Sequence, residues 1–196
     1  MESDMMRRFT MALQSTNQDV LKNIKRVNLK EEAMTKVAET AFANDMSVNT
    51  ELIIGLPGET WQSWTQGLCD LLSRDIIVEA YPVTILQNSE MNDPAYKEKH
   101  GITQVTLKSY FSNIIDEYQE TLTGTKDLPE EQMKKLWLWT WYTSMMDANG
   151  FTQIVTRYLN KRHGMQFEKF YERLLDWGLQ TDTCAAHKWL KKWQGY

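Results

Sequence analysis

The sequence predicts an α/β protein in which three parallel strands alternate with helices and an all-helical region follows. Short apolar runs at residues 9–13, 49–54 and 76–86 have the length and content of buried strands. The segments between them carry apolar residues at three- and four-residue spacing and are long enough for the crossovers that parallel strands need. Beyond residue 104 the apolar spacing is helical, so we expect residues 105–196 to contain helices only.

Composition narrows the class of protein. The 196 residues suit one domain, or one domain with a helical appendage, and 42% apolar residues are enough for a core. A net charge of −4, with Lys and Arg scattered, argues against nucleic-acid binding. No apolar run approaches a membrane span, and residues 1–8 lack the apolar core of a signal peptide. The solitary Cys69 and Cys184 indicate a reducing compartment, so a cytoplasmic location is expected.

The first strand is expected to end in two polar side chains, Gln14 and Ser15. Thr16 or Asn17 can cap a helix that follows it. Asn28, with Glu31 three residues later, resembles a capping box. We expect that box to open a second helix with one apolar face, formed by Ala33, Met34, Val37, Ala38, Ala41 and Phe42.

The stretch at residues 49–60 (Asn-Thr-Glu-Leu-Ile-Ile-Gly-Leu-Pro-Gly-Glu-Thr) predicts a strand, a tight turn and a helix start. Gly55, Pro57 and Gly58 form the turn, and Thr60 can cap the helix after it. This arrangement places backbone amides beside a ligand in α/β proteins. The third strand follows at residues 76–86, with a bend or bulge expected at Tyr81 and the proline after it.

The second half is expected to be a polar linker, residues 89–104, followed by the helical region. Its first helix is marked by Tyr110, Phe111, Ile114, Ile115, Tyr118 and Leu122. Four more are expected to begin near residues 129, 151, 167 and 189. Trp137, Trp139 and Trp141 cannot share one helix face, so we expect at least one of them to face a partner or a substrate.

A candidate ligand site lies where the three strands end. In a parallel sheet or barrel these ends share one edge, at which ligands bind. Arg26, at the end of the first helix, can reach the same edge, and Glu51 is the one acid in an apolar strand. A buried acid needs a partner, which Arg26 or a ligand amine can provide. The alternative is that Arg26 and Glu51 form a structural ion pair or are solvated.

Two blocks of sequence carry a family resemblance. Gln14-Ser15-x-Asn17 with Ile24-Lys25-Arg26, followed by the stretch from Glu51 to Thr60, resembles the second half of a radical S-adenosylmethionine core. The match spans residues 9–86 and is closest to enzymes with an N-terminal cobalamin-binding domain. Oxygen-independent coproporphyrinogen oxidases are similar over the same stretch. The resemblance implies the C-terminal half of a partial (β/α)6 TIM-like barrel at residues 1–88, comprising its strands four to six.

The resemblance also implies roles in binding S-adenosylmethionine. Gln14, with Ser15 beside it, would contact the ribose or methionyl part, and Arg26 would pair with the methionyl carboxylate. Glu51 would approach the ribose or the amino group. The backbone at Ile54 and Gly55 would pack on the adenine, and residues around Ile85 and Leu86 would close that pocket.

The cluster-binding part of the family pattern is missing. No C-x-x-x-C-x-x-C motif is present, and Cys69 and Cys184 cannot replace it because a [4Fe–4S] cluster needs clustered thiolates. The resemblance thus assigns the cluster, and cobalamin in the associated branch, to the complete enzyme and not to this chain. The chain is expected to be a truncated, split or fragmentary product, inactive alone. The open edge of its first strand then predicts a partner half or self-association.

Two further hypotheses remain. In one, the half-barrel is a non-catalytic module that binds a nucleotide or a partner protein. In the other, an unrelated α/β domain holds phosphate at Gly55 to Gly58, although no lysine follows these glycines as a phosphate-binding loop requires. The helical region would act as a substrate-side lid in the family reading, whereas the simpler alternative is that its aromatic residues pack helix on helix.

Overall fold

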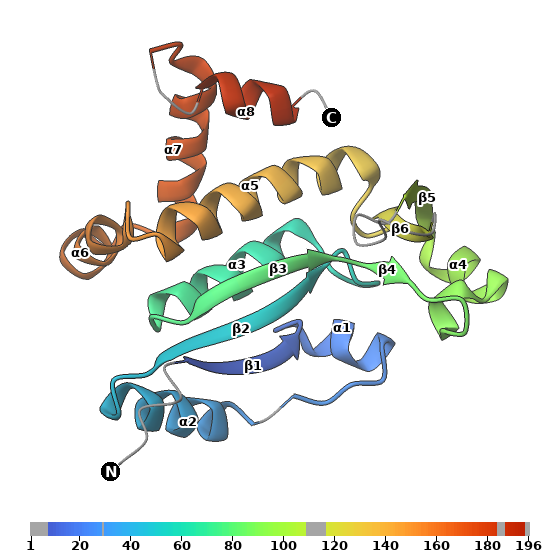
Figure 1. The fold of residues 1–196 in the computed structure, drawn as a ribbon, viewed down its shortest axis with the longest axis horizontal. Helices are drawn as coiled ribbons and strands as arrows, with labels where there is room; N and C mark the ends of the chain where they lie inside the picture. The colour runs from blue at the N-terminus through green and yellow to red at the C-terminus, as the bar shows by residue number, and fades with distance from the viewer. Residues whose placement is uncertain (1–7, 29, 109–116, 184–186, 195–196) are drawn as a thin grey trace.

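The computed structural model describes residues 8–28, 30–108, 117–183 and 187–194, and Figure 1 shows their arrangement. The described chain forms two three-stranded sheets and eight α-helices. One sheet is parallel, with the order β1-β2-β3, and the other is antiparallel, with the order β4-β6-β5. The predicted α/β class is therefore confirmed. None of the described helices is long and apolar enough to cross a membrane.

The parallel sheet agrees with the strands expected from the sequence. It consists of β1 (Arg8–Gln14), β2 (Ser47–Ile54) and β3 (Ile77–Pro82), with β2 in the centre. Within the described part of the chain β1 pairs only with β2, so its other edge is open. Three strands form an open sheet, and a closed or partial barrel is not observed in the described chain.

The helices α1 (Gln18–Asn23), α2 (Glu31–Ala43) and α3 (Trp61–Ser73) connect these strands. Asn17 caps α1 by accepting from the Asp19 backbone N–H, and Thr60 forms a capping box with Ser63. The capping box predicted at Asn28 is wrong, because α2 begins later, with Lys30 as its N-cap. The Asn28 side chain instead donates to the Ser15 carbonyl (2.7 Å) and so ties the start of this connection to the end of β1.

The third predicted strand is interrupted. β3 ends at Pro82, and after Val83 the chain enters β4 (Thr84–Ile85), which belongs to the antiparallel sheet. Pro82 has no N–H to donate to a sheet ladder, and this explains why the pairing stops there. The bend expected at this position therefore transfers the chain from one sheet to the other.

The segment expected to be a linker and a helix has a different structure. It contains a 3-10 turn (η1, Glu90–Asn92), α4 (Pro94–His100), β5 (Thr103–Lys108) and β6 (Tyr118–Gly124). Tyr118 and Leu122 lie four residues apart, which also fits a helix, but β6 pairs with β5 over its whole length. The all-helical prediction for residues 105–196 is thus wrong for these strands, and residues 110–115 lie outside the described chain.

The remaining helices agree with the sequence. They are α5 (Glu130–Ala148), α6 (Gln153–His163), α7 (Phe167–Gln180) and α8 (His187–Gln194). Gly164 ends α6 in the left-handed conformation, whereas α7 continues two residues past Gly178. Trp139 is buried and Trp137 and Trp141 are half-buried against the core, so these aromatic residues pack mainly between helices.

The core lies on one face of the parallel sheet. α2 contacts β2, while α3 and α5 contact β3, and Figure 1 shows α5 running alongside β3. The strand residues on this face are buried, among them Met11, Val48, Leu52 and Val78. Trp64 of α3 joins the helices to each other, since its Nε1 donates to Thr140 of α5 (2.7 Å). The described helices leave the opposite face of the sheet uncovered.

A buried ionic cluster holds the outer helices. Asp147 at the end of α5 is 2% exposed and accepts from Arg157 Nη1 (2.6 Å) and from the Tyr171 hydroxyl (2.9 Å). Arg157 also donates to Asp75 (2.5 Å) and to the Leu72 carbonyl (2.7 Å) at the end of α3. A buried carboxylate requires such partners, and the cluster therefore connects α3, α5, α6 and α7.

Candidate functional site

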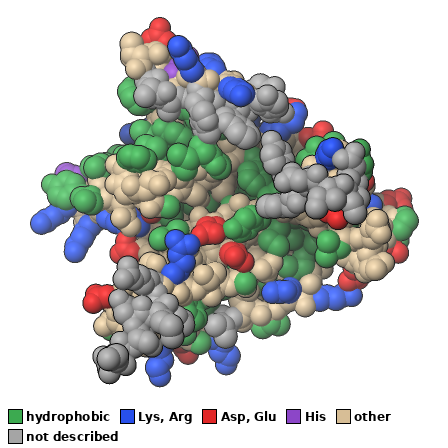
Figure 2. Space-filling view, viewed as in Figure 1, with side chains coloured by type: hydrophobic (Ala, Val, Ile, Leu, Met, Phe, Trp, Pro, Cys, Tyr) green, Lys and Arg blue, Asp and Glu red, His purple; other side chains and the backbone are tan. Residues whose placement is uncertain are grey.

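The uncovered face of the parallel sheet carries most of its polar side chains. The register aligns Ala12, Glu51 and Glu79 in one row across the three strands, and Ile53 lies beside Tyr81 in the next row. These five residues are half-buried or exposed, in contrast to their buried neighbours on the other face. Figure 2 shows acidic and basic side chains close together over the strands in the middle of this view.

Glu79 is engaged by its neighbours. Its carboxylate accepts from Asn49 Nδ2 (2.9 Å), from the Tyr81 hydroxyl (2.9 Å) and from Arg8 Nη1 (3.4 Å). The hydrogen bond to Glu79 raises the pKa of Tyr81, because it favours the protonated phenol. Glu79 therefore serves mainly to organise the polar side chains of this face.

Glu51 differs from Glu79 although the two lie side by side. Among the described residues, the Glu51 carboxylate has no hydrogen bond or ion pair, and the pair with Arg26 that one hypothesis required is not formed. A carboxylate can accept up to about four hydrogen bonds. Glu51 thus leaves its acceptors available on the uncovered face.

The carboxyl end of β1 has an unusual backbone. Gln14 has φ 66°, a left-handed conformation that non-glycine residues adopt rarely, and the register with β2 shifts between Ala12 and Gln14. The next residue, Ser15, donates its N–H to the Leu13 carbonyl (2.8 Å) in a tight turn. Lys25, Asp45 and Asp75 also adopt this conformation, so it marks the tight turn after β1, and the role of Gln14 as a site residue stays a prediction.

Ser15 is buried, and its side chain is used inside the protein. Its hydroxyl donates to Glu59 Oε2 (2.9 Å) and accepts from the Asn17 N–H (3.0 Å). Glu59 also accepts from the Ser63 hydroxyl in the first turn of α3. The Ser15 side chain therefore joins the end of β1 to the start of α3 and does not point to the uncovered face.

Glu59 is the residue that the sequence analysis missed. It is 1% exposed, and burial raises its pKa, an effect that the hydrogen bonds from Ser63 and Ser15 partly oppose. The position of Glu59 directly before the helix cap Thr60 is the signal that could have revealed it. An acid there interacts favourably with the helix N-terminus.

The turn after β2 is held tightly. Gly55 has φ 87° and is buried, and a Cβ on it would lie 2.2 Å from Met133 Cε. Asn23 of α1 donates to the Pro57 carbonyl (2.9 Å) on the other side of the turn. Glycine is favoured at Gly55 because a side chain would be strained at this φ and would displace the end of the Met133 side chain. The Ile54 side chain points into the core, which leaves its backbone as the part available to a ligand.

The other predicted site residues lie in different surroundings. Arg26 follows α1, is exposed, and has no ion pair with a described residue. Its neighbourhood is fixed by an ion pair between Lys25 and Glu90 (2.8 Å) that joins the end of α1 to η1. Ile85 is buried in β4 and Leu86 is 66% exposed, so both belong to the antiparallel sheet and its margin.

Figure 1 shows where that margin lies. The antiparallel sheet and α4 are placed beyond the carboxyl ends of β1, β2 and β3, whereas α5 runs alongside β3 and α7 stands on the far side of α5. Leu122 of β6 approaches Gly55, where a Cβ would lie 3.4 Å from it. Met133 of α5 lies at Gly55 as well, so the antiparallel sheet and the start of α5 both stand next to the end of β2. The expected role of the helical region as a lid stays a prediction.

An iron–sulfur cluster does not fit the described residues. No group of three or more His, Cys, Asp or Glu side chains among them could hold a metal ion. Burial, together with nearby acids led by Glu168, raises the pKa of Cys69 to about 12, which keeps it as a thiol. Cys184 lies outside the described chain. The described residues therefore offer no set of thiolates for a cluster.

Comparison with known proteins finds two similar enzymes. The chain is 28% identical, over 97% of its length, to "Cobalamin-dependent radical SAM methyltransferase TokK" of Streptomyces tokunonensis. It has the same identity and coverage with "2-(S-pantetheinyl)-carbapenam-3-carboxylate methyltransferase" of Streptantibioticus cattleyicolor. The chain spans 29% of the length of each relative. No protein-family model matches it.

These relatives support the interpretation of the chain as a radical S-adenosylmethionine fragment of the cobalamin-associated kind. The relation to coproporphyrinogen oxidases that the sequence suggested is not among the relatives found. The similarity extends through residues in both sheets and in the helical region, far beyond the two blocks at residues 14–26 and 51–60. The region after residue 86 is therefore part of the same evolutionary unit.

Proposed function

We propose that the chain is a portion of a cobalamin-dependent radical S-adenosylmethionine methyltransferase and supplies part of the S-adenosylmethionine site. The observation that carries this proposal is the similarity to two such methyltransferases over 97% of the chain. The uncovered polar face and the strained end of β1 support it, because an α/β protein binds its ligand at the carboxyl ends of its strands.

Glu51 and Gln14 are the proposed polar contacts. The free carboxylate of Glu51 suits a ribose hydroxyl or the ammonium group of S-adenosylmethionine, since both donate hydrogen bonds. Gln14 stands at the end of the neighbouring strand and offers both a donor and an acceptor. The backbone of Ile54 and Gly55 would provide the apolar wall for the adenine.

Arg26 is the proposed contact for the methionyl carboxylate. Its exposed guanidinium has no ion pair with a described residue, and a guanidinium can bind a carboxylate through two parallel hydrogen bonds. Ser15 would act indirectly, because its hydroxyl holds Glu59 and thereby positions the end of β1. Ile85 and Leu86 would close the adenine pocket from the antiparallel sheet.

The remaining cofactors belong to the rest of the enzyme in this proposal. A [4Fe–4S] cluster and cobalamin would be held by protein outside residues 1–196, and the cluster would supply the electron that cleaves S-adenosylmethionine. The chain alone would bind S-adenosylmethionine weakly and would not cleave it. The uncovered face and the open edge of β1 would be the contact with the missing part of the barrel.

The test is to titrate S-adenosylmethionine by calorimetry into the chain, alone and mixed with an N-terminal part of the Streptomyces tokunonensis relative. We expect binding in the mixture to weaken by about tenfold or more in Glu51→Gln and in Arg26→Ala, as loss of a charged contact predicts. Glu79→Gln and Lys25→Ala are the matched controls, since both change charge next to these residues and both original side chains already have partners.

Each outcome has a definite meaning. Equal binding by Glu51→Gln, Arg26→Ala and the wild type would remove these residues from the site. A mixture that is reconstituted with iron and sulfide but forms no cluster and cleaves no S-adenosylmethionine would contradict the enzymatic proposal. Binding of a nucleotide in that same mixture would instead favour the non-catalytic module.

A further inference from the structure

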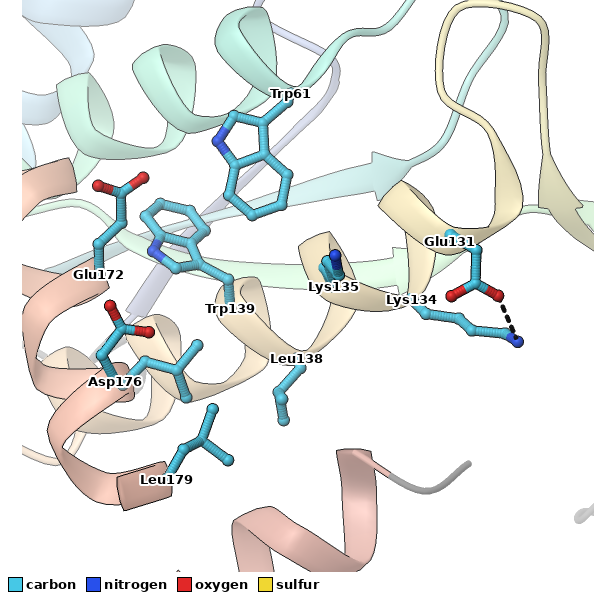
Figure 3. Close-up of a pocket in the computed structure, with 10 residues that line it drawn as sticks. Trp61, Glu131, Lys134, Lys135, Leu138, Trp139, Glu172, Asp176 and Leu179 are labelled. Carbon is cyan, nitrogen blue, oxygen red and sulfur yellow. Dashed lines mark hydrogen bonds and ion pairs between the residues drawn. The ribbon is translucent and has the colours of Figure 1, made fainter. Parts of the chain in front are cut away.

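A hollow lies on the helix-covered side of the molecule, opposite the uncovered face of the parallel sheet. It encloses about 440 Å³ between the start of α3, the first half of α5 and α7 (Figure 3). This volume is within the range of about 300–1,000 Å³ that is usual for small-molecule sites. Trp61 and Trp139 form its aromatic walls, with ring centroids 6.2 Å apart and planes tilted by 51°.

Within the part of the chain that the structure describes, the indole N–H of Trp139 has no hydrogen-bond acceptor. Trp139 is 1% exposed, and its Nε1 is a buried donor without an acceptor among the described residues. By contrast, the nearby Trp64 donates its Nε1 to Thr140 at 2.7 Å. An unpaired buried donor is costly, so it points to an acceptor that the protein does not itself provide. Figure 3 shows the indole nitrogen of Trp139 turned towards the side of the hollow that α7 forms.

Two acids face that side of the hollow. Glu172 and Asp176 lie four residues apart on α7, a spacing that brings like charges together at an energetic cost. No hydrogen bond or ion pair joins either carboxylate to a described residue. Burial raises the pKa of Glu172, and repulsion from Glu168 and Asp176 adds to this effect. A cation in the hollow would relieve this repulsion.

The lysines at the opposite end do not neutralise these acids. Lys134 forms its ion pair with Glu131 (3.3 Å), one turn earlier on the same helix, and Figure 3 shows this pair pointing away from α7. Lys135 extends from α5 next to Trp139. The hollow thus has an acidic end on α7, an aromatic middle and a basic end on α5.

We propose that this hollow binds a small organic ammonium compound that has an apolar body and a hydrogen-bond acceptor beside its ammonium group. Glu172 and Asp176 would hold the ammonium group, and the apolar body would lie against Trp61 and Trp139. The hydrogen-bond acceptor of the compound would accept from the indole N–H of Trp139. Aromatic faces attract cations and apolar groups alike, so the two tryptophans suit such a molecule. The site is separate from the proposed S-adenosylmethionine edge and does not depend on it.

Four probes of similar size separate these contacts. L-Phenylalanine amide has the ammonium group, the apolar body and the acceptor. N-Acetyl-L-phenylalanine amide removes the charge, 2-phenylethylamine removes the acceptor, and 3-phenylpropanoate reverses the charge. We expect L-phenylalanine amide to bind about fivefold or more tightly than each of the others, and to shift the ¹⁵N–¹H signal of the Trp139 indole.

Variants then assign the contacts. Glu172→Gln should weaken binding of L-phenylalanine amide about fivefold, whereas Glu98→Gln, the same charge change at an exposed position on α4, should leave it unchanged. Trp139→Phe should remove the preference for L-phenylalanine amide over 2-phenylethylamine. Trp139 is buried, so its replacement can impair folding. Glu172 is only half-buried, and Glu172→Gln therefore tests the site without this complication.

Three results would overturn the proposal. One is equal binding of all four probes, and another is no binding of any of them at millimolar concentration. The third is binding that neither moves the Trp139 indole signal nor responds to Glu172→Gln, because the probe would then occupy another place. None of these three results would affect the proposed S-adenosylmethionine site. The two proposals can therefore be refuted independently.

Discussion

The two faces of the parallel sheet are built from alternate residues of the same three strands but differ in burial and in polarity. On one face, Leu52 and Ile54 are 1% exposed beneath α3 and α5. On the other, their neighbours Glu51 and Ile53 remain half-buried, and Tyr81 is 47% exposed. Because side chains alternate along a strand, each strand serves both a core and a surface.

The difference shows that the sheet is one layer of a larger arrangement. The apolar face is covered by helices, whereas the other face holds Glu79, which has three partners, and Glu51, which has none among the described residues. Parallel sheets usually have both faces covered. The uncovered face is therefore where a ligand or another part of a barrel would be placed, which supports the proposed function.

The covered face depends on the outer helices, and Asp147→Ala should disturb them most. It would leave Arg157 and the Tyr171 hydroxyl without their buried acceptor. We expect the free energy of unfolding in urea to fall by about 3–5 kcal/mol, as for other broken buried ion pairs. The exposed pair of Lys134 and Glu131 is the control, and Glu131→Ala should cost less than about 1 kcal/mol. Equal losses would contradict the assigned role of the cluster.

Leu52→Ala and Ile53→Ala compare the two faces directly. Leu52 is buried among the helices, so its truncation should lower the free energy of unfolding by about 2–5 kcal/mol through lost contacts and a cavity. Ile53→Ala, one residue further along the same strand, should cost less than half as much, since its side chain already meets solvent. If Ile53→Ala lowered the free energy of unfolding as much as Leu52→Ala, the face described as uncovered would be covered in solution.

Glu59 joins the end of β1 to the start of α3, and its contribution to stability should depend on pH. Burial raises the pKa of Glu59 above 4.5, so the folded state holds a proton more firmly than the unfolded state. The stability from the protonated form is then fully present below pH 4.5 and is lost as pH rises through the raised pKa. The Glu59→Gln variant should lack this loss. Urea unfolding of the wild type and of Glu59→Gln at a series of pH values from 4.5 upwards measures this loss. If the free energy of unfolding had the same pH dependence in both proteins, Glu59 would not be its cause.

The smallest effect is expected on the uncovered face. Glu79→Gln keeps one oxygen, which can still accept from Asn49, whereas Tyr81 is 47% exposed and can donate to water instead. The Arg8 contact is long and exposed. The free energy of unfolding should therefore change by less than about 0.5 kcal/mol. The variant should also lower the pKa of Tyr81 towards its usual value, which a spectrophotometric titration of the phenol can follow. A large loss of stability would mean that this face carries part of the core.

Local patterns in the sequence were sufficient for the strands and helices of the first half. The β1, β2 and β3 segments, the Thr60 cap and the Gly55 turn were all predicted, because each depends on residues close together in the chain. The strand pair β5–β6 was missed, because Tyr118 and Leu122 fit a helix as well as a strand. Pairing between residues 103–108 and 118–124 decides between the two, and spacing within one segment does not report it.

The candidate site shows the same division. Gln14, Arg26, Glu51 and Gly55 were named from the sequence, and whether they bind S-adenosylmethionine stays a prediction. The sequence could not show that Ser15 is buried against Glu59, because that contact spans 44 residues of chain. It also could not show which elements stand beside the strand ends, where the structure places the antiparallel sheet together with the start of α5.

The sequence by itself determined the α/β class, the three parallel strands and the turn from Gly55 to Thr60, since periodicity, glycine conformation and helix capping act over a few residues. Only the tertiary structure decided which face of the sheet is covered, where the chain changes sheet after Pro82, and that Trp139 is left with an unpaired N–H beside two acids. These features depend on how distant helices pack against one another, and long-range packing is not encoded in any single stretch of residues.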